Sequence, residues 1–294
     1  MGNRTVGAGM DGPAVGIVGG GTMGTGIAYV FALAGHATTV VEPDGARAAQ
    51  MLVEIRAAAA GAVARGKLDE AGAAALCRRV HRVSSIAELG DDLALAVETV
   101  PEHVELKSSV LAELEARHPR VLASNTSSIS IDRLAAALAR PERFIGMHFF
   151  NPVWSLALVE LVRGAATDQD TLAGALQFVT AIGKEAIVVA DVAGFATSRL
   201  DLIASLEAMR MLEDGVASAA DIDRAAELAY RHPVGPLRLS DIVGLDVRLD
   251  IARQLEKTYG ERYRAPQILV DLVAAGRLGR KTGHGFHEWP GQPS

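Results

Sequence analysis

Two residues near the middle of the chain have the types and spacing of a general base and the carboxylate that orients it. His148 lies between apolar strand residues shortly before an Asn-Pro pair, and Glu160 lies in the apolar stretch Leu158-Val159-Glu160-Leu161. A carboxylate in such a stretch is costly to bury without a partner. If the chain returns antiparallel after the turn, Glu160 comes to lie beside His148 and fixes its tautomer. We therefore predict a proton-transferring pair, with a histidine buried for packing alone as the alternative.

A glycine-rich loop supplies the second chemical signal. Gly19, Gly21 and Gly24 fit the G-x-G-x-x-G spacing between a strand predicted at 15–18 and a helix predicted at 26–34. The first glycine permits a tight turn, the second lets the backbone approach a pyrophosphate, and the third lets the helix pack on the strand. The helix N-terminus then faces the phosphate charge. The loop predicts a dinucleotide site, although a plain strand–helix turn would also use these glycines.

Glu42 ends the next predicted strand, residues 37–42, at the distance from the loop where dinucleotide-binding proteins place an acidic residue. A carboxylate there accepts hydrogen bonds from the adenosine ribose hydroxyls and repels a 2′-phosphate. Pro43 and Asp44 follow, so no Arg stands directly after it to bind that phosphate. We therefore predict NAD rather than NADP, with a solvated glutamate at a strand end as the alternative.

The elements that must position these residues alternate between strand and helix. This alternation predicts an α/β fold, a Rossmann-like doubly wound and mostly parallel sheet, followed by a smaller all-helical domain. We expect a flexible arm at 1–14, an NAD-binding domain at 15–191 and a helical substrate and dimerisation domain at 192–294. Further strands are predicted at 93–97, 121–124, 144–149, 156–161 and 186–190. Helices are predicted at 45–66, 103–117, 131–139, 170–182, 199–213, 219–229, 239–259 and 266–275, and a further helix begins at residue 69.

Composition limits the classes of function. Of the 294 residues, 49% are hydrophobic and 22% are charged, which is ordinary for a soluble globular protein. The net charge of −6 gives no general attraction to nucleic acid or to an anionic membrane. No apolar run has the length of a membrane span, and the single cysteine, Cys77, excludes an internal disulfide. These features predict a cytoplasmic protein that binds small molecules, without a metal site.

Several motifs, taken together and in this order, resemble the short-chain 3-hydroxyacyl-CoA dehydrogenases, including the bacterial 3-hydroxybutyryl-CoA dehydrogenases. The resemblance spans about residues 15–287. Motifs in the right order are far more specific than a glycine loop alone. They are GGGTMG at 19–24, VETVPE at 97–102 with Lys107, SNTSS at 124–128, HFFNP at 148–152 with Glu160, Asp191 with Gly194-Phe195, HPVGP at 232–236 and GRKTGHGF at 279–286.

The resemblance implies a reaction, a set of roles and a homodimer. A (3S)-hydroxyacyl-CoA would be oxidised to the 3-ketoacyl-CoA, with hydride passing to NAD. The expected substrate has a short acyl chain. His148 would take the hydroxyl proton, Glu160 would orient His148, and Ser127 would bind the substrate oxygen. The remaining residues that it places at the site are Asn151 beside the substrate and Thr22, Met23, Glu102, Lys107, Asn125 and Ser127 along the cofactor.

The chain departs from the family pattern on the acyl side of the expected site. Ser198 stands where the family usually has Asn. Trp154, Ser155 and Ala157 stand where a Pro, a small apolar residue and a Lys are expected. His287 replaces a common Tyr. Ser198 could reach the acyl thioester or could simply cap a helix. A basic stripe of Arg56, Arg65 and Lys67 could bind the phosphates of coenzyme A or be a solvated helix face. A free hydroxy acid, a carrier-protein-bound acyl group and NAD binding without turnover stay open as alternatives.

Overall fold

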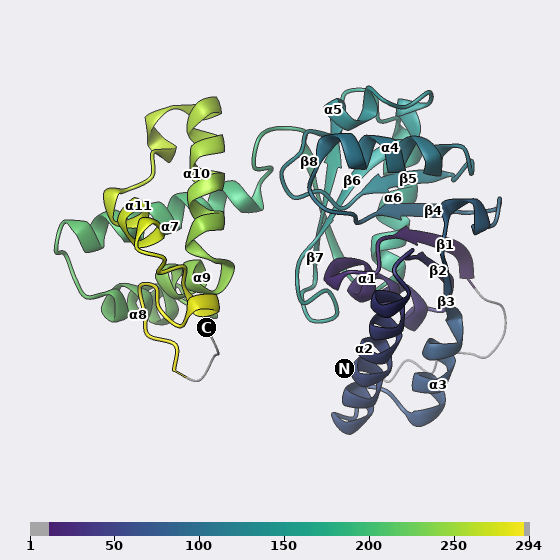
Figure 1. Cartoon of the computed structure of the whole chain (residues 1–294), viewed down its shortest axis with the longest axis horizontal. Helices are drawn as coiled ribbons and strands as arrows, with labels where there is room; N and C mark the ends of the chain where they lie inside the picture. Colours follow the sequence, from purple (N-terminus) through teal and green to yellow (C-terminus); the bar gives the residue numbers. More distant parts are fainter. Residues whose placement is uncertain (1–11, 291–294) are drawn as a thin grey trace. The chain divides into compact units, whose positions relative to one another are not determined.

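The computed structural model describes residues 12–290 and divides the chain into two compact units, Met1–Asp191 and Val192–Ser294 (Figure 1). Within the described residues, all of the named strands belong to the first unit and the second unit is built from helices. Residues 1–11 of the expected arm lie outside the described residues. Gly12 to Ala14, which were expected in that arm, already belong to the first strand.

The first unit is built on an eight-stranded sheet of order β3-β2-β1-β4-β5-β6-β7-β8. Every neighbouring pair is parallel except β6 with β7, which confirms the predicted doubly wound, mostly parallel fold. The strand order reverses between β1 and β4, where such sheets bind their ligands. The strands are β1 Gly12–Val18, β2 His36–Val41, β3 Val80–Val83, β4 Leu95–Glu98, β5 Val121–Ser124, β6 Phe144–Phe149, β7 Leu158–Arg163 and β8 Glu185–Ala190.

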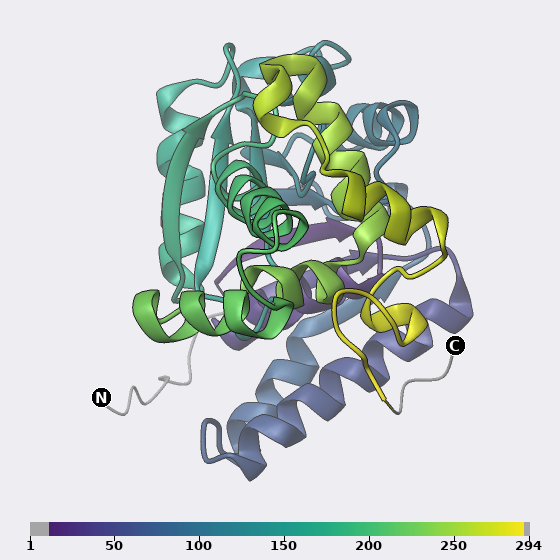
Figure 2. The ribbon, with the colours of Figure 1, turned by 90° about the vertical axis from the view of Figure 1, so that its left-hand side faces the viewer.

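Helices cover both faces of this sheet. On one face α1 (Thr22–Leu33) and α6 (Gln169–Ala181) meet through an edge-to-face contact of Phe31 with Phe178. On the other face α4 (Val104–Glu115) contacts α5 (Ile131–Ala135). Between β2 and β3, α2 (Gly45–Ala64) and α3 (Glu70–Arg79) lie side by side as a helical pair (Figure 2). The central strands β4, β5 and β6 are therefore buried on both sides, whereas the edge strands β3 and β8 carry exposed side chains.

Sequence reasoning missed one strand. β3 (Val80–Val83) reads Val-His-Arg-Val, and its two central side chains are exposed because it is an edge strand. Four residues with a polar centre carry almost no hydrophobic periodicity. Only the pairing of β3 with β2 makes this segment a strand.

The second unit packs its helices around one apolar core that includes Leu206, Leu249 and Leu255. The single helix predicted at 239–259 is wrong: Gly244 adopts a φ of 108° and divides this segment into α9 and α10. A residue with a side chain is strained at that φ, so the glycine marks the break. The helices are α7 Thr197–Glu213, α8 Ala219–Tyr230, α9 Pro236–Val243, α10 Leu245–Tyr259 and α11 Gln267–Ala274.

Candidate active site

The chemistry-bearing segments of the first unit follow the carboxyl ends of neighbouring parallel strands. The glycine loop follows β1, residues 99–102 follow β4, residues 125–128 follow β5, and His148 lies near the end of β6. Parallel strands end at the same edge of a sheet, so these segments gather at the point where the strand order reverses.

His148 and Glu160 form the buried pair that the sequence predicts. They face each other in the antiparallel register of β6 and β7, and His148 Nδ1 lies 2.8 Å from Glu160 Oε2. Their strand neighbours Met147 and Leu161 belong to the core on the α1 and α6 side, so alternation directs the pair to the other face. The ring of Phe150 lies 4.3 Å from the imidazole ring. The arrangement is that of a base held by a carboxylate.

A second buried ion pair, between Glu98 and Lys107, was not assigned from the sequence. Lys107 Nζ lies 2.8 and 3.0 Å from the two oxygens of Glu98, and it also contacts Val100 O and Glu102. Burial raises the pKa of Glu98 against the opposing effect of the Lys107 charge. Lys107 is almost fully buried, and its ammonium group holds the carboxylates of Glu98 and Glu102.

Glu102 organises the turn after β5. Its Oε1 accepts hydrogen bonds from Thr126 Oγ1 at 2.6 Å and from the backbone N–H groups of Ser127 and Ser128 at 3.0 Å. Burial alone would raise the pKa of Glu102, but the Thr126 bond and the charge of Lys107 outweigh it and lower the pKa. Glu102 therefore links the β4 and β5 ends as a carboxylate. Thr126, which sequence reasoning also left unassigned, donates one hydroxyl hydrogen bond to Glu102, and Ser128 donates another at 2.9 Å.

Asn125, Ser127 and Asn151 lie on the segments around the pair. Asn125 Oδ1 accepts a hydrogen bond of 2.8 Å from the backbone N–H of Phe149, which ties the turn after β5 to the strand of His148. Ser127 is exposed, and its hydroxyl oxygen lies 3.4 Å from Glu102 Oε1, which is a weak hydrogen bond. Asn151 is exposed in the loop after β6, and its peptide bond to Pro152 is cis.

Gly19, Gly21 and Gly24 of the glycine loop lie in different surroundings. Gly19 has a φ of 107°, and a Cβ on Gly24 would lie 1.8 Å from Gly19 O. Gly21 has open space where a Cβ would be, and it precedes α1, which has neither a side-chain cap nor an acidic residue in its first turn. An uncapped helix N-terminus beside an open glycine is suited to bind a phosphate group.

Glu42 is buried at the other side of the loop. Its two oxygens accept hydrogen bonds from the backbone N–H groups of Gly20 at 3.0 Å and Asp44 at 2.9 Å. Arg47, from the first turn of α2, places a guanidinium nitrogen 3.6 Å from the carboxylate. Sequence reasoning looked for a basic residue directly after Glu42 and missed this one, which the helix brings back to it.

Ser198 lies in the second unit, where it is the second residue of α7. The N-cap of this helix is Ala196, and no side chain caps it. The alternative that Ser198 is an N-cap is therefore wrong. His287, the other departure in this unit, contacts Asp223 through Nε2 at 2.7 Å.

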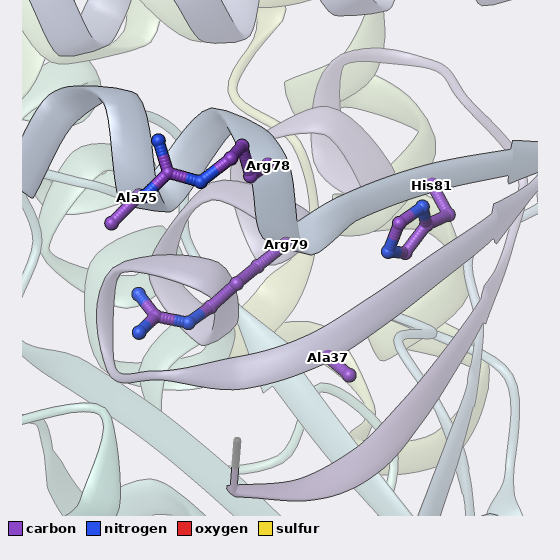
Figure 3. Close-up of a pocket in the computed structure, with 5 residues that line it drawn as sticks. All are labelled: Ala37, Ala75, Arg78, Arg79 and His81. Carbon is purple, nitrogen blue, oxygen red and sulfur yellow. The ribbon is translucent and has the colours of Figure 1, made fainter. Parts of the chain in front are cut away.

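The first unit carries pockets that contain basic side chains. A cavity of about 420 Å³ is lined by apolar residues of α1 and α2 together with Arg65, Lys67 and Trp154. Figure 3 shows a smaller one, in which Arg78, Arg79 and His81 surround the start of β3. The second pocket lies at the amino ends of β2 and β3, far from the carboxyl edge that carries His148.

Comparison with known proteins agrees with this geometry. The model of the 3-hydroxyacyl-CoA dehydrogenase NAD binding domain matches residues 14–192, and that of the 3-hydroxyacyl-CoA dehydrogenase C-terminal domain matches residues 194–289. A 3-hydroxybutyryl-CoA dehydrogenase of Bradyrhizobium diazoefficiens is 42% identical over 94% of this chain and 95% of its own.

Two further relatives cover nearly the whole chain. A 3-hydroxybutyryl-CoA dehydrogenase of Mycobacterium tuberculosis is 41% identical over 94% of this chain and 98% of its own. The crystal structure of an (S)-3-hydroxybutyryl-CoA dehydrogenase of Ralstonia eutropha, 37% identical, matches with a TM-score of 0.90 over 94% of this chain and 98% of that one. The resemblance seen in the motifs is thereby confirmed, and the chain belongs to the 3-hydroxyacyl-CoA dehydrogenase family.

Proposed function

We propose that the chain catalyses the reversible oxidation of a short-chain (3S)-hydroxyacyl-CoA to the 3-ketoacyl-CoA, with NAD as the hydride acceptor. The observation that carries this proposal is the buried contact of 2.8 Å between His148 Nδ1 and Glu160 Oε2. Oxidation of an alcohol requires a base on its hydroxyl group, and a protein that only bound NAD would have no use for an oriented base.

The side chains around the pair take distinct roles in this reaction. His148 removes the hydroxyl proton through Nε2, because Nδ1 faces Glu160. The carboxylate stabilises the resulting imidazolium, and its burial leaves the attraction little screened by water. Ser127 binds the substrate oxygen from the turn after β5, and Asn151 lies beside the substrate.

The residues of the glycine loop fit the pyrophosphate of NAD. The open space at Gly21 and the uncapped start of α1 leave room and backbone N–H groups for it, with Thr22 and Met23 in the first turn. When bound, NAD supplies the hydride acceptor that no side chain provides. Glu42 is held in place by hydrogen bonds from two backbone N–H groups, and it accepts further hydrogen bonds from the adenosine ribose hydroxyls.

The segments that follow β4 and β5 would hold the nicotinamide half of the cofactor. Glu102 and Asn125 would contact the nicotinamide or its ribose, and Ser127 would serve both the cofactor and the substrate. Lys107 acts indirectly, because it is buried against Glu98 and holds Glu102 in place.

Coenzyme A as the carrier is supported by the cavity beside α2. Arg65 and Lys67 supply two cations in a cavity that is also lined by apolar residues of α1 and α2, which suits a nucleotide with phosphate groups. Arg56 is exposed on the same helix. The relatives named above are 3-hydroxybutyryl-CoA dehydrogenases, which supports a short acyl chain.

The test is the oxidation of NADH by the purified chain with acetoacetyl-CoA, followed at the NADH absorbance band. Turnover with this substrate, with NADPH a poor replacement, is the expected result. Turnover only with an acetoacetyl carrier protein or a free keto acid would assign a different substrate. NADH binding without turnover of any of these would refute the enzymatic proposal.

Assembly and location are also proposed. A homodimer through the second unit is supported by apolar side chains on its surface, among them Leu200 and Leu228, which are 71% and 73% exposed. Light scattering coupled to size-exclusion chromatography measures the mass directly. A cytoplasmic location is supported by the NAD and acyl-CoA chemistry proposed above. None of the helices in residues 12–290 is long and apolar enough to cross a membrane.

A further inference from the structure

The loop between β6 and β7 joins the strand of His148 to the strand of Glu160, and one side of it is anchored in the core. Val153 in this loop is 1% exposed and packs directly against α1. A Cβ on Gly26 of α1 would lie 2.7 Å from Val153 Cβ, so the helix and the loop touch at a position that only glycine fills comfortably. The loop is therefore seated against α1 at a fixed depth.

The next residue, Trp154, faces outward from the same turn. It is 44% exposed, contacts the ring of Tyr29 edge-on at 5.9 Å and lines the cavity that also holds Arg65 and Lys67. This position is one of the departures from the family pattern. The wall of the proposed coenzyme A cavity is thus carried by the loop that connects the catalytic pair.

The turn that carries Trp154 is closed by a lysine from another part of the chain. The backbone N–H groups of Ser155 and Leu156 both bond to Pro152 O, and the carbonyls of Val153 and Leu156 accept hydrogen bonds of 2.6 and 2.5 Å from Lys184 Nζ. A cation that binds two carbonyls of one turn stabilises that turn as a basic residue stabilises a helix C-terminus.

Lys184 is itself held firmly. Its backbone N–H bonds to Val179 O at the end of α6, and the next residue, Glu185, pairs with Ala157 at the end of the loop. Burial lowers the pKa of the Lys184 ammonium. Within residues 12–290, the hydrogen bonds found for its ammonium group are those to the carbonyls of Val153 and Leu156, so the 152–156 turn supplies these partners of the partly buried charge.

We propose that Lys184 is a positioning residue that sets the affinity for the acyl-CoA substrate by holding the 152–156 turn and, through it, Trp154. This inference rests on the proposed function. It acts on the substrate side and leaves the glycine loop, where NADH binds, untouched.

The kinetic test compares Lys184→Met, Trp154→Ala and the double variant. Lys184→Met should raise KM for acetoacetyl-CoA about tenfold, the equivalent of one hydrogen bond to a charged group. The change in kcat and in the Kd of NADH should stay within twofold. The double variant should be no worse than Trp154→Ala, because both changes remove the same wall. Lys184→Arg should recover part of the affinity, and Lys257→Met, at an exposed lysine of α10, is the matched control for lost charge.

A second readout does not depend on activity. The chain has two tryptophans, so a Trp289→Phe background leaves Trp154 as the fluorophore. Lys184→Met should make its emission clearly easier to quench with acrylamide, and Lys184→Gln serves if the Met variant does not fold. Additive KM effects, a loss confined to kcat, or unchanged quenching would each overturn the proposal. An inactive wild type with increased quenching in the variant would refute the enzymatic function and leave the positioning role standing.

Discussion

Removing the negative charge of Glu160 tests the central claim about the site. Glu160→Gln keeps the shape of the side chain and can keep the hydrogen bond to His148, but it cannot stabilise an imidazolium. The two groups are 2.8 Å apart and Glu160 is fully buried. At an effective dielectric constant appropriate to proteins, such a pair is worth about 2–4 kcal/mol. That free energy corresponds to a loss of roughly 30- to 1000-fold in kcat.

The assay is steady-state reduction of acetoacetyl-CoA, with NADH affinity measured separately by fluorescence titration. His148→Ala removes the base itself and should cost about 10²–10⁴-fold in rate while NADH still binds. The double variant should be little worse than His148→Ala, because Glu160 acts only through that ring. Thermal unfolding of each variant controls for lost structure. Near-additive losses, or a Glu160→Gln enzyme with wild-type kcat, would refute the reasoning.

Three further predictions address the cofactor, the acyl side and pH. Glu42→Ala should weaken NAD binding by about 1–3 kcal/mol, measured by titration, and a wild type that prefers NADPH would contradict the assignment. Ser198→Asn should change kcat/KM for acetoacetyl-CoA several-fold with NADH affinity kept, since one neutral hydrogen bond is worth about 1 kcal/mol. Identical kinetics across an acyl-CoA chain-length series would remove Ser198 from the site. The pKa of Glu102 is lowered, because the hydrogen bond from Thr126 and the charge of Lys107 outweigh the effect of burial. The ionised Glu102 therefore stabilises the fold above its ordinary pKa of 4.5, and this stabilisation is lost as pH falls through the lowered pKa. Denaturant titrations should show a smaller loss of stability below about pH 4.5 for Glu102→Gln than for the wild type; equal losses would contradict this.

Much of this protein was determined by the sequence itself, where a feature depends on local pattern. The glycine spacing with its flanking strand and helix predicts the loop, because a positive φ at Gly19 and close packing at Gly24 need glycine whatever surrounds them. The sequence also predicted that His148 and Glu160 face each other, because they lie on two strands joined by a turn and because an unpaired buried carboxylate is costly. Strand and helix alternation was enough to predict the doubly wound sheet.

Only the tertiary structure decided what depends on residues far apart in the chain. The sequence does not show that Lys107 pairs with Glu98, because packing of α4 on β4 brings the two side chains together. Nothing in the residues around Lys184 indicates that its ammonium meets the carbonyls of Val153 and Leu156, because backbone acceptors leave no signature in a sequence. Arg47 reaches Glu42 only once α2 has formed. Local periodicity records which face of an element is buried, whereas side-chain partners are chosen by how the elements pack.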